Sequence, residues 1–171
     1  MEENVCTYYY SSPAGKIRIT AKDGSITSLK FVKKNEKTDS DAKVCLDENG
    51  EHSGNAAALA QVIKWLDIYF SGKKPNFFPP LKVEGTDFQK KIWQITTQIP
   101  FGKTASYSFI AKKCGCRYAR AIGFAMNVNP VQLIVPCHRV IGSDGKLVGY
   151  AGGLEIKKWL LQFEELHFSE K

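Results

Sequence analysis

The residues with the clearest chemical potential form the sequence Pro136-Cys137-His138-Arg139. They follow an apolar, largely β-branched run over 131–135, and apolar residues resume directly after them. Such a run predicts a buried extended segment, in which a cysteine is ordinarily inert because burial raises the pKa of a thiol. Proline fixes φ and removes a backbone donor, so we expect the strand to turn at Cys137. The adjacent histidine and arginine favour the thiolate, and the sequence therefore indicates a reactive cysteine.

The composition is that of a soluble protein with enough apolar residues for a core. The chain has 171 residues, of which 43% are hydrophobic, and this suffices for one large or two small domains. Its longest apolar run is too short to cross a bilayer, and no signal-peptide pattern opens it, so we expect no membrane partner. Cysteines that are odd in number and lack framework spacing predict reduced thiols in a cytosolic compartment; they are Cys6, Cys45, Cys114, Cys116 and Cys137.

The net charge of +7 is concentrated in the second half of the chain. Residues 1–84 carry 12 Lys/Arg against 11 Asp/Glu, whereas residues 85–171 carry 12 against 6. The excess of +6 in the second half indicates a polyanionic partner. A lysine-rich solubilising surface is the alternative interpretation.

The first half has the pattern of a scaffold. Alternating residues over 7–31, interrupted by the tight-turn dipeptide Asp23-Gly24, predict antiparallel strands. The polar stretch 33–54 predicts a long loop whose role the sequence does not indicate. Residues 1–84 contain no catalytic constellation.

A helix is predicted to follow that loop. Asn55 can cap it, and Ser71-Gly72 can end it near Phe70. The proline-containing stretch 73–80 then predicts a linker. The apolar face of the helix is predicted to hold Leu59, Val62, Ile63, Leu66 and Phe70.

The second half predicts a helix-turn-helix. Thr86 can cap a helix whose apolar spacing continues to Ile99. Ser106 can cap a short helix, and Gly115 suits a left-handed C-cap. A second helix over 117–127 follows this glycine-containing turn, and it is the candidate DNA-binding element.

This second helix has unusually small side chains for a major-groove reader. Ala119, Ala121, Gly123 and Ala125 leave few groups that could hydrogen-bond base edges. Small side chains permit close approach to a narrow groove, where Arg120 could act as a wedge. Tight packing of the helix inside the protein is the alternative.

The C-terminal residues predict a turn, a loop and a helix. Residues 142–145 form the predicted turn, 147–148 a short return strand, and 149–153 a flexible loop that could cover a pocket. The last helix is predicted over 154–164. Glu164 would lie at its end, where the helix dipole disfavours a carboxylate; a solvated terminal glutamate is the ordinary interpretation.

Taken together, motifs spread over residues 85–171 resemble the O6-alkylguanine-DNA alkyltransferases. Pro-Cys-His-Arg alone is a weak motif, but the set is highly specific in order and spacing. Residues 1–84 resemble the variable N-terminal domain of this family in size and pattern only. The matching motifs are Gly85-Thr86-Asp87-Phe88-Gln89, Ile99-Pro100-Phe101-Gly102-Lys103-Thr104, Ser106-Tyr107, Ala119-Arg120-Ala121-Ile122-Gly123, Asn129-Pro130, Pro136-Cys137-His138-Arg139-Val140, Gly149-Tyr150-Ala151-Gly152-Gly153 and Lys157-Lys158-Trp159-Leu160-Leu161.

The resemblance implies two domains and a DNA substrate. Residues 1–84 would form an α/β domain of ribonuclease-H-like appearance, and residues 85–171 a mainly α domain with a winged-helix-like helix-turn-helix. The partner would be double-stranded DNA bearing O6-alkylguanine, bound through the minor groove by a monomer. The protein would be cytoplasmic, associated with the nucleoid in a prokaryote and nuclear in a eukaryote. Cooperative DNA binding and activity on O4-alkylthymine stay open.

The resemblance also implies catalytic roles. Cys137 would accept the alkyl group, His138 would take its proton through a water, and Glu164 would orient His138. Tyr107 would crowd the neighbouring phosphate and then hydrogen-bond the leaving guanine, with Lys157 near it. Cys137, His138 and Glu164 would thus act as nucleophile, base and orienting group, as in a catalytic triad, but the atom attacked would be an alkyl carbon. Because nothing in the sequence offers a way to cleave the thioether product, we expect one turnover per molecule.

Other matched residues would contact DNA. Arg120 would enter the duplex in place of the extruded nucleotide, and Ala119 and Gly123 would lie against the groove beside Tyr107. Asn129 would tie the recognition helix to the active-site turn. Extrusion is required because the alkyl group lies inside the duplex, and it costs a few kcal/mol of stacking.

The remaining matched residues would form the substrate pocket. Tyr150 and the loop through Gly152 and Gly153 would wall it, while backbone groups of Val140 and Ala151 would read the base edges. Some relatives carry serine at the position of Ala151, and a backbone contact survives that change.

We expect neither a cofactor nor a metal. Some relatives bind structural zinc in the N-terminal domain, but Cys6, Cys45 and His52 lack the ligand spacing for it. Cys114-Gly115-Cys116 could bind a metal or oxidise, although plain turn residues are the simpler interpretation.

Two other functions compete with alkyl transfer. A DNA-damage sensor would keep the helix-turn-helix and transfer nothing, but it would not need Cys137, His138, Tyr107 and Glu164 together. A cysteine hydrolase would use the Cys-His pair, yet it would explain neither Arg120 nor the basic second half.

Overall fold

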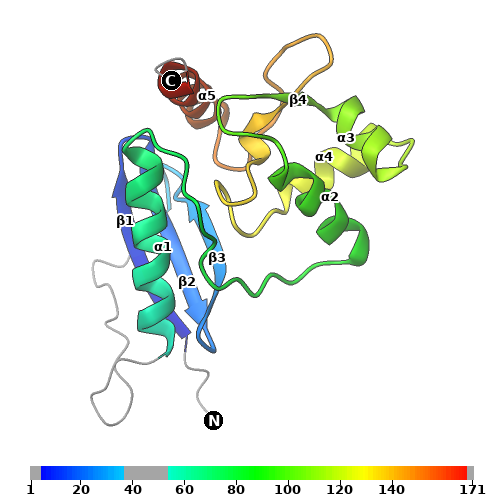
Figure 1. The fold of residues 1–171 in the computed structure, drawn as a ribbon. Coiled ribbons are helices and arrows are strands. Elements are labelled where there is room, and N and C mark those ends of the chain that lie inside the picture. Colours follow the sequence, from blue (N-terminus) through cyan, green and yellow to red (C-terminus); the bar gives the residue numbers. More distant parts are fainter. Residues whose placement is uncertain (1–4, 37–53, 169–171) are drawn as a thin grey trace. The chain divides into compact units, whose positions relative to one another are not determined.

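The chain folds into two compact units, Met1–Glu84 and Gly85–Lys171. The computed structural model describes residues 5–36 and 54–168. An N-terminal domain contains a sheet and a helix, and the C-terminal domain is mainly helical (Figure 1), as the sequence predicts. Residues 37–53 of the predicted loop, with Cys45 and His52, lie outside the described residues.

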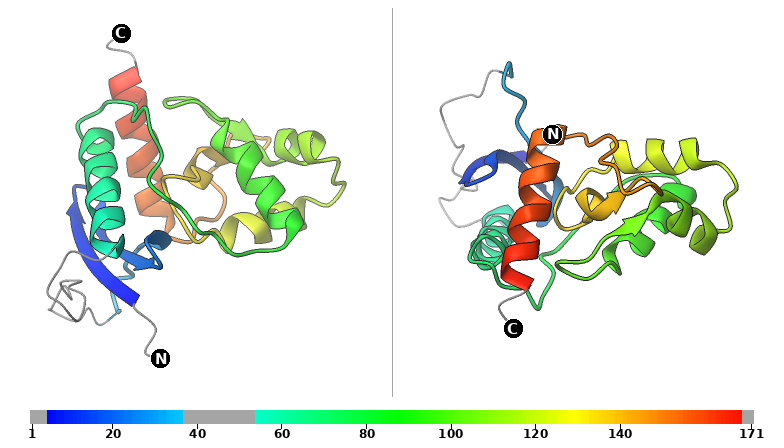
Figure 2. Two further views of the ribbon diagram at one scale, coloured as in Figure 1. Left: turned by 60° about the horizontal axis from the view of Figure 1, so that its bottom comes forward. Right: turned by 90° about the horizontal axis from the view of Figure 1, so that it is seen from above.

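The N-terminal unit is an antiparallel three-stranded meander covered by one helix. The strands are β1 (Val5–Ser12), β2 (Gly15–Lys22) and β3 (Ser25–Phe31), in the order β1-β2-β3, and the helix is α1 (Gly54–Phe70). Two views show α1 lying along one face of this sheet (Figures 1 and 2). The predicted strands over 7–31 are therefore confirmed.

The β2–β3 turn sets the register of the sheet. Asp23 and Gly24 have φ values of 52° and 73°, the left-handed conformation that matches the twist of a tight hairpin. The pairing that follows places Ile19 opposite Tyr8 on β1 and Leu29 on β3. Ile19 and Leu29 are fully buried, as alternation predicts.

Helix α1 begins at Gly54, two residues before the start that a cap at Asn55 predicts, so Asn55 lies inside the helix and does not cap it. Asn55 is buried, and its amide oxygen accepts the backbone N–H of Gly24 at 2.8 Å. The side chain thus ties the helix start to the hairpin turn. The buried face of α1 differs from the predicted one in that Ile63 and Phe70 are only half-buried; its members are Asn55, Ala58, Leu59, Val62, Trp65, Leu66 and Tyr69.

The C-terminal unit contains four α-helices among its described residues, joined by short strands and one 3₁₀ turn. Thr86 caps the first helix with a reciprocal capping box: its hydroxyl accepts from Gln89 N, and the Gln89 amide oxygen accepts from Thr86 N. The elements are α2 (Asp87–Thr97), β4 (Ala105–Ser106), α3 (Tyr107–Cys114), α4 (Ala119–Asn127), η1 (Cys137–Arg139), β5 (Val140–Ile141) and α5 (Leu154–Phe168).

The predicted helix-turn-helix is present as α3 and α4. Ser106 Oγ accepts the N–H of Phe109 at 3.1 Å, and Gly115 closes α3 with φ 77°. Helix α4 begins at Ala119, two residues later than predicted, because the backbone N–H of Tyr118 donates to Cys116 Sγ instead. Buried residues of α2, α3 and α4 meet in one apolar core.

The segment before Cys137 is buried but is not a strand. Residues 131–140 are all buried, yet the backbone turns at Leu133, where φ is 70°, and Val135 N donates back to Val131 O at 3.0 Å. The prediction of an extended segment was wrong because the chain turns back at Leu133, and the Asn129 amide holds both ends of this turn by accepting from Val131 N and donating to Val135 O.

The C-terminal predictions were partly right. The turn at 142–145 is confirmed by the hydrogen bond from Gly145 N to Gly142 O at 3.0 Å, but the described structure has no return strand at 147–148. Helix α5 continues to Phe168, so Glu164 lies inside the helix rather than at its end.

Two further expectations concern the whole described chain. Cys114, Cys116 and Cys137 are free thiols, but Cys6 is disulfide-bonded, so the prediction of reduced thiols is wrong for Cys6. Within residues 5–36 and 54–168, no helix combines the length and apolar character needed to cross a membrane.

Candidate active site

Cys137 opens the 3₁₀ turn η1, and the local chain geometry explains why. Pro136 has φ −80° and ψ 62°, which turns the chain as predicted at this proline. The N–H of Cys137 then donates to Val135 O at 2.8 Å, and that of Arg139 to Pro136 O at 2.9 Å. The turn holds the thiol at a pocket wall with only 3% of the residue exposed.

The surroundings of the thiol are not those the sequence predicted. Burial raises the pKa of Cys137 to about 11, while the Asn129 amide and the charge of Lys157 lower it. Asn129 Nδ2 lies 3.1 Å from Cys137 Sγ and 2.9 Å from Val135 O. The thiolate is therefore favoured by Asn129, Lys157 and the backbone N–H groups of Cys137 and His138. The expectation that the side-chain charges of His138 and Arg139 would do this was wrong.

Behind the thiol, His138 is paired with a carboxylate. His138 Nε2 lies 2.7 Å from Glu164 Oε1, and both side chains are buried. Burial lowers the pKa of His138 although Glu164 opposes this, so the imidazole is neutral at pH 7. An ionised carboxylate can only accept, so Nε2 carries the proton and Nδ1 is the basic nitrogen. Within the described residues, Nδ1 is buried and has no hydrogen-bond partner.

Glu164 is held by more than the histidine. Arg139 Nε donates to Oε2 at 2.8 Å and Arg139 Nη2 to Oε1 at 2.9 Å, a bidentate pair, and Gly102 N donates to Oε2 at 3.0 Å. Burial raises the pKa of the carboxyl, but His138 and Arg139 outweigh it and hold that pKa well below its usual value. The carboxylate is thus charged and fixed in orientation.

From the sequence, Arg139 was expected only to favour the thiolate, and its contacts in the structure are different. Its Nη1 donates to Ile99 O at 2.7 Å, and its guanidinium lies over the Phe101 ring at 5.7 Å. It therefore anchors Glu164 to the loop after α2 rather than facing the thiol. The sequence pattern that could have predicted this pairing is a cation inside an apolar run, because a buried arginine needs a charged partner.

Lys157 is fully buried on α5 and holds the loop opposite the thiol. Its Nζ donates to Val140 O at 2.6 Å, Val148 O at 2.8 Å and Gly149 O at 3.1 Å. Three acceptors match the three protons of an ammonium group. Burial lowers the pKa of Lys157 to about 8, and nearby Cys137 opposes this; the side chain is charged at neutral pH.

Tyr107 lies near Lys157, as predicted. Nζ lies 5.9 Å from the centre of the Tyr107 ring, and the Tyr107 hydroxyl donates to Val148 O at 3.3 Å. Parallel pairing of β4 with β5 brings the start of α3 beside the end of η1, and this pairing positions Tyr107. Burial raises its pKa, so the phenol keeps its proton as a donor.

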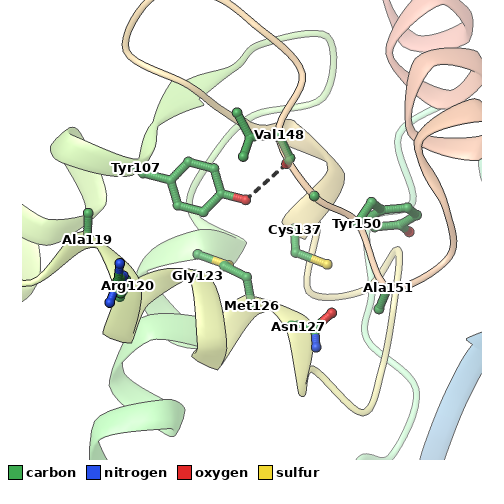
Figure 3. Close-up of a pocket in the computed structure, with 11 residues that line it drawn as sticks. Tyr107, Ala119, Arg120, Gly123, Met126, Asn127, Cys137, Val148, Tyr150 and Ala151 are labelled. Carbon is green, nitrogen blue, oxygen red and sulfur yellow. Dashed lines mark hydrogen bonds between the residues drawn. The ribbon is translucent and has the colours of Figure 1, made fainter.

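A pocket of about 510 Å³ joins these groups to α4. Figure 3 shows Cys137 and Tyr150 on one side and Ala119 and Arg120 of α4 on the other. Burial raises the pKa of Tyr150 well above its usual value, and its buried hydroxyl has no partner among the described residues. The lining residues are Tyr107, Ala119, Arg120, Gly123, Met126, Asn127, Cys137, Val148, Gly149, Tyr150 and Ala151.

The pocket lining contains half of the predicted site residues, and His138, Glu164 and Lys157 lie buried outside it. Gly152 and Gly153 lie beyond its lining, and Val140 is fully buried behind it, where its carbonyl serves Lys157. Asn129, predicted to contact DNA as well as to tie the helix to the turn, is fully buried beneath the thiol. The prediction that Asn129 contacts DNA was therefore wrong, because its side chain is not accessible. The structure instead contains its predicted bonds to the active-site turn.

Three lining residues were not predicted for the pocket: Met126, Asn127 and Val148. Gly149 belongs to the loop 149–153 that was expected to cover it. Helical spacing from Ala119 and Gly123 could have pointed to Met126 and Asn127. In the described part of the chain, no three His, Cys, Asp or Glu side chains are grouped to hold a metal ion.

Comparisons with known proteins agree on one family. Residues 5–83 match the model described as 6-O-methylguanine DNA methyltransferase, ribonuclease-like domain, and residues 87–166 match its DNA binding domain. A methylated-DNA–protein-cysteine methyltransferase of Methanosarcina barkeri is 42% identical over 90% of this chain and 93% of its own length.

Solved structures give the same result. The Mycobacterium tuberculosis O6-methylguanine methyltransferase is 35% identical with a TM-score of 0.77, and the match covers 95% of this chain and 94% of that one. The M. tuberculosis protein in complex with DNA is 37% identical with a TM-score of 0.75, covering 93% and 92%.

Proposed function

Since this chain belongs to the 6-O-methylguanine DNA methyltransferase family and is a DNA-repair methyltransferase of the methylated-DNA–protein-cysteine class, we propose that Cys137 is its acceptor cysteine. The observation that carries this proposal is the pocket in which Cys137 lines one wall and the small side chains of α4 line the other (Figure 3). A thiol buried beside a helix of DNA-binding type can meet only a base that has left the duplex.

The transfer is a displacement at the alkyl carbon. Cys137 Sγ forms a bond to that carbon while the bond from the carbon to O6 of guanine breaks. The electron pair of the broken bond stays on O6 of the leaving guanine. The thiol proton passes through a water to His138 Nδ1, and the guanine is restored when it gains a proton. Neutral His138, oriented by Glu164 at 2.7 Å, supports the base role. Because the thioether is stable, each molecule acts once.

Asn129 and Lys157 support the same step by stabilising sulfur charge. The thiol is protonated at neutral pH because its pKa is about 11, so proton removal and attack must be coupled. The amide 3.1 Å from Sγ and the ammonium group on the far side of the loop favour the developing thiolate. Tyr107 supplies a donor at the pocket that can hydrogen-bond the leaving guanine.

DNA is bound through the minor groove by α4. Ala119 and Gly123 permit close approach, and Arg120 fills the space left by the extruded nucleotide. The net charge of +6 over residues 85–171 supports binding dominated by phosphates and therefore weakened by salt. The protein acts as a monomer, its N-terminal domain is of the ribonuclease-H type, and α3 and α4 belong to a winged-helix-like domain.

Mass mapping tests the acceptor directly. The protein is mixed with a duplex containing one O6-methylguanine, and its proteolytic peptides are analysed by mass spectrometry. One methyl group per molecule on the Cys137 peptide is expected, none in Cys137→Ser, and an unchanged yield in Cys116→Ser, which alters the other thiol nearest α4. Tight DNA binding without modification of Cys137 would overturn the proposal and make the chain a lesion-sensing protein.

A further inference from the structure

Helix α4 carries one large exposed apolar side chain that does not line the pocket. Phe124 is 62% exposed. The inward face of α4 is formed by Ile122, Ala125 and Met126, which are buried. On a helical wheel the direction opposite these three falls between Arg120 and Phe124. These two side chains, four residues apart, are therefore neighbours on the outermost face.

A single exposed apolar residue is ordinary on a protein surface, but the position of Phe124 affects how closely α4 can approach a partner. Gly123 and Ala119 line the pocket mouth, and their minimal side chains allow the helix backbone to come close to a flat surface. A phenyl ring on the adjoining face would hold the helix away from that surface unless the ring enters it. The face that carries Arg120 therefore fits a partner with an apolar gap beside a polyanionic backbone.

Duplex DNA has that combination at its base steps. Minor-groove proteins insert Phe, Leu, Ile, Met or Pro between base pairs and thereby kink the duplex. Four residues of helix span about 6 Å along the axis, close to twice the roughly 3.4 Å between bases of one strand. With α4 lying along the groove, Phe124 meets the DNA about two base steps from the gap that Arg120 fills.

We propose that Phe124 is an apolar wedge that enters the minor groove beside the extruded nucleotide, so that α4 carries two inserting side chains, one charged and one aromatic. This inference rests on the proposed function, because it assumes that α4 faces the minor groove. Partial unstacking by Phe124 at a neighbouring step weakens the stack that retains the target nucleotide. Phe124 thus acts on extrusion and bending, and not on alkyl transfer itself.

The test compares two substrates with one set of variants. Phe124→Ala removes the ring, Phe124→Leu keeps an apolar wedge, and Phe88→Ala is the matched control, since Phe88 is also an exposed phenylalanine of this unit but lies on α2. Rates of Cys137 methylation are measured with a duplex containing O6-methylguanine and with O6-methylguanine as the free base. Bending of the duplex is followed by energy transfer between dyes at its ends.

Phe124→Ala is expected to slow repair of the duplex by roughly tenfold, a typical consequence of losing one aromatic contact to a base, and to reduce the bend. Phe124→Leu is expected to retain most of both, Phe88→Ala all of both, and the free-base rate should stay within about twofold in every variant. A duplex rate for Phe124→Ala within twofold of wild type overturns the wedge, and so does an equal loss on both substrates, which would indicate a structural effect. If the wild-type protein itself takes no methyl group from the duplex, the proposed function fails instead.

Discussion

The two walls of the pocket are built on opposite principles. The wall behind Cys137 consists of buried charged groups, in which one carboxylate accepts from His138, Arg139 and Gly102 and one ammonium group donates to three carbonyls. The wall formed by α4 is more exposed, with Met126 as its buried member, and its lining consists mostly of small or neutral side chains with Arg120 as its cation.

The difference separates two tasks. A chemical step requires groups that are already oriented before the substrate arrives, and burial with complete hydrogen bonding achieves this. A surface that must fit a deformed duplex requires few internal contacts, so that its side chains are available to the partner. Substitutions behind the thiol should therefore alter stability and chemistry together, whereas substitutions on α4 should alter DNA repair alone.

The largest effect is expected for Glu164→Gln. Arg139 would remain buried without a carboxylate, and breaking a buried ion pair in this way costs about 3 kcal/mol of the free energy of unfolding. His138 would lose its orienting charge, so methyl transfer should slow by at least about a hundredfold. Denaturant unfolding and free-base transfer kinetics measure the two losses.

The control is Glu165→Gln, which changes the exposed neighbouring glutamate and should alter stability by less than about 0.5 kcal/mol. Normal stability in Glu164→Gln would contradict the view that the carboxylate links chemistry to folding.

A smaller and more selective effect is expected for Arg120→Ala. Loss of the side chain that fills the stack should slow duplex repair by about tenfold to a hundredfold, while the melting temperature and the free-base rate stay near wild type. Lys158→Ala, which removes an exposed positive charge on α5, serves as the control for net charge. A loss of stability in Arg120→Ala would mean that the two walls are not independent.

The smallest effect is expected from pH, measured on the free base so that DNA does not titrate. The thiol proton moves to His138, so the reactive thiolate–imidazolium population is independent of pH between the lowered pKa of His138 and the Lys157 pKa of about 8, the range in which Lys157 keeps its charge. The rate should therefore change by less than about threefold from pH 6.5 to 7.5.

Above pH 8 the same rate should fall, because Lys157 loses the proton whose charge favours the thiolate; its pKa is about 8. A rate that rises tenfold per pH unit instead would mean that free thiolate attacks without help from His138.

Local signals in the sequence were sufficient for much of this architecture. The caps at Thr86 and Ser106, the left-handed Gly115 and the Asp23-Gly24 turn act through the nearest residues of the chain, and all four are confirmed. The same holds for the helix-turn-helix, which depends on helical periodicity and one glycine.

The errors arose where a polar side chain had a distant partner. Asn55 was predicted to cap a helix, but it bonds a hairpin 31 residues earlier. Asn129 bonds Val131 N and Val135 O within a segment that was predicted to be a strand. Arg139 follows the thiol in sequence but pairs with a carboxylate 25 residues later. The partners in these hydrogen bonds are not separated by the regular spacing of a helix or a strand, so the sequence pattern alone cannot predict them.

By itself, then, the sequence determined which residues are chemically suited to alkyl transfer and which helix can approach DNA closely, because residue type and periodicity are properties of the chain. The tertiary structure decided how the thiol is tuned. Only the packing of α5 against η1 buries Glu164 and Lys157 behind Cys137. Burial of the thiol and the imidazole raises the pKa of Cys137 to about 11 and keeps His138 neutral, while Lys157 and Glu164 oppose these two shifts. Electrostatic strength depends on the loss of water around a group, and that loss exists only in the folded protein.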